Sequence, residues 1–186
     1  MAGRSRGRGA GDAGTRPRPV DLDPEGVARQ TLLDQLAVRA RSRSELQQKL
    51  ARKGVPAEVS EPLLDRFTEV GLIDDGAFAQ AWVEQRSRTK GLGRRALMQE
   101  LRRKGVEQVH IEAALSEIGA DEERDAAREL AEKRLRSLSR LEPAVQRRRL
   151  EGFLARKGYS GGLVSEVVRE VIEAAHDESL EVWHST

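Results

Sequence analysis

The chain has 186 residues, of which 34% are charged and only 3% aromatic, and its formal net charge is +2. It contains no cysteine, which excludes disulfides and thiolate metal sites and is compatible with a reducing cytoplasm. No apolar run approaches the roughly 18 residues that a membrane span needs. The basic N-terminal segment lacks the apolar core of a secretory signal. We therefore expect a cytoplasmic protein with an aliphatic core and no membrane segment.

The small net charge hides an uneven distribution. Residues 1–20 carry a net charge of +4, which leaves −2 for the rest of the chain. Residues 1–24 form an Arg/Gly-rich arm, which we expect to be disordered; a weak contact of this arm with nucleic acid or an acidic surface is the alternative.

Helical periodicity of apolar residues begins after the arm and continues to about residue 175. The predicted helices span about 25–40, 43–53, 56–70, 75–89, 93–104, 107–118, 121–138, 143–157 and 161–175. They group by threes into units at 25–71, 72–119 and 120–176, followed by a short tail at 177–186. Trp183 in this tail either folds back on the last helix or is exposed.

One ten-residue pattern occurs in the second helix of every unit. Its glycines lie 51 and 53 positions apart, and an arginine precedes the first leucine by three residues in each copy. The copies are Leu46-x-x-x-Leu50-x-Arg52-Lys53-Gly54-Val55, Leu97-x-x-x-Leu101-x-Arg103-Lys104-Gly105-Val106 and Leu150-x-x-x-Leu154-x-Arg156-Lys157-Gly158-Tyr159. Self-similarity at this spacing predicts an all-α protein of three tandem three-helix repeats in an elongated, curved array.

The pattern has a structural explanation within each unit. Its leucines share one helix face and are predicted core residues, while Gly54 and its counterparts occupy the left-handed position that ends a helix. One aspartate of Asp74-Asp75 is expected to cap the fourth helix. We expect stacking of neighbouring units to complete each small core. The third unit departs from the pattern, because Gly152 lies within its second helix and Gly161-Gly162 begin its third.

No catalytic or metal-binding constellation is found in the sequence. The three histidines, at positions 110, 176 and 184, are scattered and form no ligand pattern. The segment Lys90-Gly91-Leu92-Gly93 lacks the spacing of a phosphate-binding loop and is better explained as a joint between helices. We predict no catalytic residue, no metal and no cofactor, and therefore no enzyme.

Charge is sorted by helix. The second helices are basic, with net charges of +4, +5 and +4 over residues 41–53, 90–104 and 146–157. The third helices are acidic, with −3, −3 and −2 over residues 56–70, 107–118 and 161–175. An acidic last helix is a poor match for the DNA major groove, which argues against a sequence-reading helix-turn-helix.

Two interpretations of this sorting remain open. Basic and acidic helices pair with each other, or the second helices line up into a basic stripe that contacts an acidic protein surface or a nucleic-acid backbone held in a protein assembly. For the second interpretation the candidate partner-binding residues are Arg43, Arg52, Lys53, Arg94, Arg95, Arg103, Lys104, Arg147, Arg156 and Lys157.

Two further blocks carry a family resemblance. The segment Gly71-Leu72-Ile73-Asp74-Asp75-x-x-Phe78-Ala79-x-x-Trp82, followed by Arg86, resembles the most characteristic motif of the RecX family, regulators of the bacterial recombinase RecA. The block Lys90-Gly91-Leu92-Gly93 with Leu97-x-x-x-Leu101-x-x-Lys104-Gly105-Val106 resembles the next block of that family. The similarity covers about residues 27–175 and excludes the arm and the tail.

The resemblance implies an all-α regulator that binds in the groove of the RecA–single-stranded-DNA filament. It implies inhibition of RecA's ATPase, strand-exchange and coprotease activities, and hence a role in DNA repair, recombination and the SOS response. The partner would be the RecA filament, with weak direct DNA contact in addition, and we expect a monomer. The alternative is a nonspecific nucleic-acid-binding helical repeat protein that acts without RecA.

Overall fold

The computed structural model describes the backbone of residues 23–184 and the side chains of residues 23–176. Over this range the chain is all-α. Its helices are α1 (Pro24–Val38), α2 (Arg43–Arg52), α3 (Ala57–Glu69), α4 (Asp75–Lys90), α5 (Arg94–Arg103), α6 (Gln108–Ser116), α7 (Ala120–Arg136), α8 (Pro143–Lys157) and α9 (Gly161–His184). Residues 1–22 of the predicted arm lie outside the described residues.

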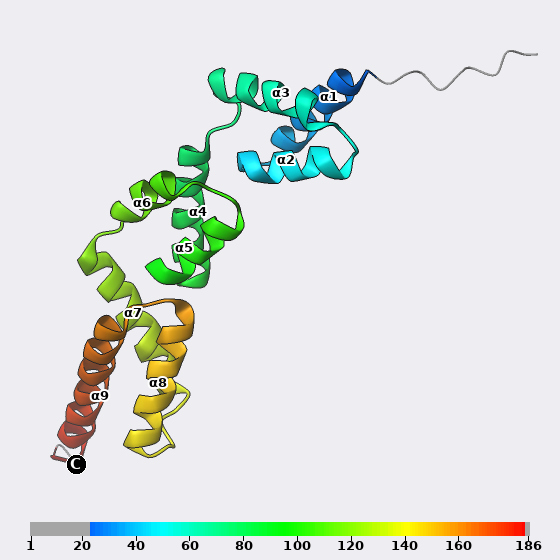
Figure 1. Ribbon diagram of the computed structural model, residues 1–186. Coiled ribbons are helices and arrows are strands. Elements are labelled where there is room, and N and C mark those ends of the chain that lie inside the picture. The colour runs from blue at the N-terminus through cyan, green and yellow to red at the C-terminus, as the bar shows by residue number, and fades with distance from the viewer. Residues whose placement is uncertain (1–22, 185–186) are drawn as a thin grey trace, which may run out of the picture.

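The helices form three successive bundles that follow one another along a curved line (Figure 1). The first unit is α1–α3, the second α4–α6 and the third α7–α9, and the helices that pack along their lengths belong to the same unit. The predicted elongated, curved array of three-helix repeats is confirmed.

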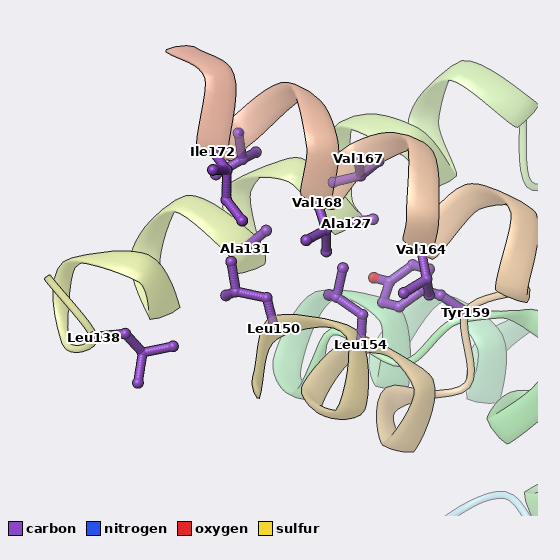
Figure 2. Close-up of a cluster of buried hydrophobic side chains, with 11 residues drawn as sticks. Ala127, Ala131, Leu138, Leu150, Leu154, Tyr159, Val164, Val167, Val168 and Ile172 are labelled. Atoms are coloured by element: carbon purple, nitrogen blue, oxygen red, sulfur yellow. The ribbon is translucent and has the colours of Figure 1, made fainter. Parts of the chain in front are cut away.

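Each unit has a hydrophobic core of its own. One cluster of buried residues lies within 28–73, one within 78–115 and one within 127–172. In the third unit, Leu150 and Leu154 of α8 point between α7 and α9 (Figure 2). The expectation that neighbouring units complete each other's cores is therefore wrong, because three aliphatic faces are enough to bury the leucines within one unit.

The repeated leucines are the centre of each core. All six are fully or almost fully buried, with at most 1% of the residue exposed: Leu46, Leu50, Leu97, Leu101, Leu150 and Leu154. Burying a leucine side chain is worth about 1.5–3 kcal/mol, so these positions carry much of the stability of each bundle.

The ends of the second helices are defined as the sequence predicts. Gly54, Gly105 and Gly158 follow or end these helices with φ of 77°, 70° and 93°. Only glycine adopts this left-handed conformation without strain, so the glycine ends the helix.

The helix starts are capped by side chains. Ser42 and Glu45 form a capping box at α2, and the Asp74 side chain accepts from the Ala77 N–H at 2.8 Å at α4. Asp74 is therefore the capping residue of the aspartate pair.

The last helix differs from its predicted length. α9 continues to His184, whereas the sequence predicts an end near residue 175 followed by a tail. The apolar spacing that marks the core-facing part of the helix stops near Ile172, but good helix formers continue beyond it. Trp183 lies in this extension, where the described structure includes no side chains.

Separate cores predict separate responses to core mutations. Leu101→Ala should cost about 2–5 kcal/mol, because it leaves a cavity among α4, α5 and α6. Hydrogen–deuterium exchange should show the loss of protection concentrated in these three helices. In the equivalent variant Leu50→Ala, the loss of protection should instead be concentrated in α1–α3. An equal loss over all three units in both variants would show that the bundles share one core.

Candidate functional site

The ten candidate cations occupy three sets of equivalent positions, with Arg95 in addition. Three arginines precede the first repeated leucine by three residues; Arg43 and Arg94 begin α2 and α5, whereas Arg147 lies one turn inside α8. In the last turn of the second helix stand Arg52, Arg103 and Arg156, and at its end Lys53, Lys104 and Lys157. Their surroundings differ from set to set, so they do not serve one purpose.

The helix-end lysines of the second and third units contact the preceding unit. The Lys104 Nζ donates to the Glu45 Oε1 at 2.6 Å, and the Lys157 Nζ donates to the Lys90 carbonyl at 2.5 Å. Lys53, which has no preceding unit, donates to the Thr31 hydroxyl at 3.1 Å within its own bundle. Lys104 and Lys157 therefore lie at joints between units.

Hydrogen bonds to the carbonyl groups at the ends of α5 and α8 make the same joint twice. The Ser42 hydroxyl donates to the Lys104 carbonyl at 2.6 Å, and the Gly93 N–H donates to the Lys157 carbonyl at 2.9 Å. The Arg95 N–H also donates to the Gly158 carbonyl at 3.1 Å. In both joints the negative end of one second helix meets the positive end of the second helix before it, which satisfies terminal groups and opposes complementary dipole ends.

The motif glycines allow this close approach. A Cβ at Gly158 would overlap the backbone of Ala96, and one at Gly105 would overlap the side chain of Ser44. A Cβ at Gly54 would meet nothing within 4 Å. Gly105 and Gly158 thus have two roles, helix ending and contact with the neighbouring unit, while Gly54 has only the first.

Trp82 is the centre of the first joint. Its Nε1 donates to the Glu100 carboxylate at 2.9 Å, and the ring carries Arg86 at 4.3 Å and Lys104 at 4.8 Å from its centroid. Cations over an indole face are attracted by its quadrupole. Trp82 therefore holds Lys104 where its ammonium reaches Glu45 of the first unit.

The pKa values of the two carboxyl groups at this joint, Glu45 and Asp75, are shifted in opposite directions. Burial disfavours the charge of Glu45, but the hydrogen bond and charge of Lys104, with the Ser42 N–H, outweigh it and lower the pKa of Glu45. Burial raises the pKa of Asp75, although its carboxylate accepts from the Arg43 N–H at 2.8 Å. The second aspartate of the pair thus ties α4 to the start of α2, a role that no local sequence pattern indicates.

Two of the three arginines that precede the repeated leucines form ion pairs. Arg43 forms ion pairs with Glu61 at 3.0 Å and Asp65 at 2.7 Å. The Arg94 Nε donates to Glu123 of the third unit at 2.9 Å. A basic second helix therefore pairs with an acidic third helix in the first unit, through Arg43. Arg94 instead pairs across units with α7, the first helix of the third unit.

The remaining candidates point outward. Arg52, Arg95, Arg103, Arg147 and Arg156 are exposed, and none forms an ion pair with another described side chain. Arg52 and Arg103 donate only to a carbonyl of their own helix, Gln48 and Gln99, each at 3.2 Å. We call these five the outer arginines; they are the part of the predicted basic stripe whose charge is free for a partner.

The described residues hold no group of His, Cys, Asp and Glu side chains that could bind a metal. Within residues 23–184 no helix combines the length and apolarity that crossing a bilayer requires.

The role of the joint glycines can be measured with a matched pair of variants. Gly158→Ala and Gly54→Ala both place alanine in a left-handed conformation, at a cost of about 1–2 kcal/mol. Only Gly158→Ala also pushes against α5, so it should speed hydrogen exchange of the Gly93 and Arg95 amides. Gly54→Ala should leave these amides protected. If the Gly93 and Arg95 amides were equally protected in both variants, Gly158 would not be needed for the contact between α8 and α5.

Comparisons with known proteins agree with this architecture. Models of the first, second and third three-helix domains of RecX match residues 28–67, 74–115 and 121–168. The chain is 45% identical over 157 residues to the regulatory protein RecX of Streptomyces coelicolor, covering 84% of each chain. It is 46% identical over 164 residues to that of Amycolatopsis mediterranei, covering 87% of this chain and 94% of the relative.

Solved structures show the same fold. The crystal structure of RecX from Lactobacillus salivarius aligns with a TM-score of 0.76 at 21% identity, covering 81% of this chain and 97% of that one. A crystal structure of a regulatory protein RecX aligns with a TM-score of 0.74 at 28% identity, covering 80% and 74%. The three matched domains and the identity over most of the chain show that this protein belongs to the RecX family of regulatory proteins.

Proposed function

We propose that this protein is a non-enzymatic regulator that binds the RecA–single-stranded-DNA filament. It mainly inhibits RecA's recombinase, ATPase and coprotease activities, and so acts in the cytoplasm as a monomer in recombination, DNA repair and the SOS response. Membership of the RecX family supports a regulatory role. The elongated, curved shape of the array favours a partner that is itself elongated, such as a filament.

The observation that carries the proposal is the repetition of an exposed arginine at one position in every unit. Arg52, Arg103 and Arg156 each stand in the last turn of a second helix, and the joints hold these helices end to end. A helical filament offers equivalent acidic or phosphate groups on successive protomers. Contacts that are weak singly then add by multivalency, because each later contact forms within an already bound complex.

The alternative is a repeat protein that binds nucleic acid without RecA. Exposed arginines support it as well, because they neutralise phosphates of any strand. DNA-dependent ATP hydrolysis by the cognate RecA separates the two proposals. A filament regulator should inhibit when substoichiometric to RecA, whereas a DNA competitor needs enough protein to coat the DNA.

Charge reversal of the equivalent arginines tests the contact surface. Arg52→Glu, Arg103→Glu and Arg156→Glu should each raise the protein concentration for half-inhibition about threefold to tenfold, which corresponds to about 0.7–1.4 kcal/mol. In the triple variant the protein concentration for half-inhibition should rise more than about 100-fold, because the three contacts act together.

Arg169→Glu is the matched control, because Arg169 is an exposed arginine of an acidic third helix with no ion pair to another described residue. It should change half-inhibition by less than about twofold. A triple variant as potent as the unmodified protein would remove these arginines from the filament contact.

A further inference from the structure

A groove lies between the second and third units, on the side formed by α4, the end of α6 and the start of α7. Its volume is about 660 Å³. Small apolar side chains line it on all three helices, among them Ala77, Ala81, Ala114 and Ala126. Because alanine fills little space, these positions leave room between the helices for an added segment of chain.

Carboxylates outnumber cations in this groove. The charged lining residues are four glutamates and two arginines, namely Glu84, Glu117, Glu122, Glu123, Arg88 and Arg94. Arg94 is already paired with Glu123 at 2.9 Å, so neither of these two charges is free for a ligand. The remaining lining charges are mainly negative, and we call this site the acidic groove.

Two of its carboxylates are exposed and weakly engaged. Glu117 accepts from the uncharged Gln80 amide at 2.7 Å. Glu84 pairs with Arg88 at 3.2 Å one turn further along α4, but these two side chains are 72% and 79% exposed. Exposed ion pairs of this kind contribute little to stability and exchange readily for a better partner. The acidic groove therefore suits a cationic ligand.

The chain carries a segment of matching chemistry in its arm. Residues 4–8 read Arg4-Ser5-Arg6-Gly7-Arg8. In an extended segment alternate side chains point to the same side, so the three guanidinium groups face one row of acceptors. Guanidinium groups bind carboxylates through paired hydrogen bonds, and the methylene stems of arginine cover apolar surface such as the alanines of the groove.

The arm is long enough for these arginines to reach the groove. Asp23 lines a pocket with residues at the start of α3, so the arm leaves the first unit there. A path along α3, residues 70–74 and α4 as far as Glu84 measures about 50 Å. Arg4 and Arg8 stand 19 and 15 positions before Asp23, which allows spans of about 65 and 50 Å. Arg16 is only 7 positions away, reaches about 25 Å and falls short.

We propose that residues 4–8 of the chain's own arm bind in the acidic groove, with their arginines on Glu84 and Glu117. The contact is intramolecular, so it forms at the high effective concentration that a tether provides. An acidic partner then has to compete with the groove for these arginines. The contact involves no RecA and is independent of the proposed function.

Paramagnetic relaxation enhancement on the full chain tests the contact. Because the chain has no cysteine, Ser5→Cys provides a single site for a nitroxide spin label. At low salt the NMR signals of the amides that line the groove, in residues 77–88 and 114–126, should lose most of their intensity, and those of α9 should not. The intensity should return when the nitroxide is reduced. It should also return at about 1 M salt, where the Debye length is about 3 Å.

A matched pair of charge variants shows whether the groove carboxylates are responsible. Glu84→Lys with Glu117→Lys should abolish the broadening. Glu132→Lys with Glu173→Lys makes the same charge change at exposed positions outside the groove and should retain most of it. If the groove variant does not melt cooperatively, Glu84→Gln with Glu117→Gln replaces it and should still lose most of the broadening.

Three results would overturn the proposal. The first is the absence of broadening at the groove in the spin-labelled chain, and the second is an equal loss in both charge variants. The third comes from mixing spin-labelled chain with nitrogen-15-labelled chain that carries no spin label. Broadening of the groove amides as strong in this mixture as within one chain would mean that the arm of a second copy occupies the groove.

Discussion

The contact between the ends of consecutive second helices is the constraint on which the rest of the structure depends. Each bundle buries its own leucines, so the three leucine cores do not join one bundle to the next. The bundles meet at a small joint, in which carbonyl groups of one helix end accept from the start of another. At the second joint the buried Tyr159 ring also lies against Gly93. Glycine is required at the joint because a Cβ would separate the helix ends. Because the same joint occurs twice, the second unit sits on the first in much the same way as the third sits on the second.

The joint also divides the repeated Arg-Lys pair into two roles. In the second and third units the lysine donates to the preceding unit, while the arginine beside it is exposed and forms no ion pair with a described side chain. Of the arginines that precede the repeated leucines, Arg43 and Arg94 form ion pairs with described side chains and Arg147 does not. Part of the positive charge of α2 and α5 is therefore paired within the protein, and the outer arginines keep theirs available to a partner.

The sequence predicts the features that depend on neighbours along the chain. Helix periodicity, the buried leucines, the left-handed glycines and the cap at Asp74 follow from local rules. The joints do not, because they connect residues about sixty positions apart, such as Ser42 with Lys104 and Gly93 with Lys157, and the acceptor is a backbone carbonyl, which every residue possesses. For the same reason the sequence could not separate joint lysines from outer arginines.

The central claim is that the joints hold three independent bundles as one array of defined shape. The absence of cysteine allows two spin labels at chosen sites, and Glu58→Cys on α3 with Glu173→Cys on α9 places them on exposed positions of the first and third units. Double electron–electron resonance on this protein should give one narrow distance distribution at the separation in the structure. A broad distribution would contradict the account, because it would mean that the units move independently.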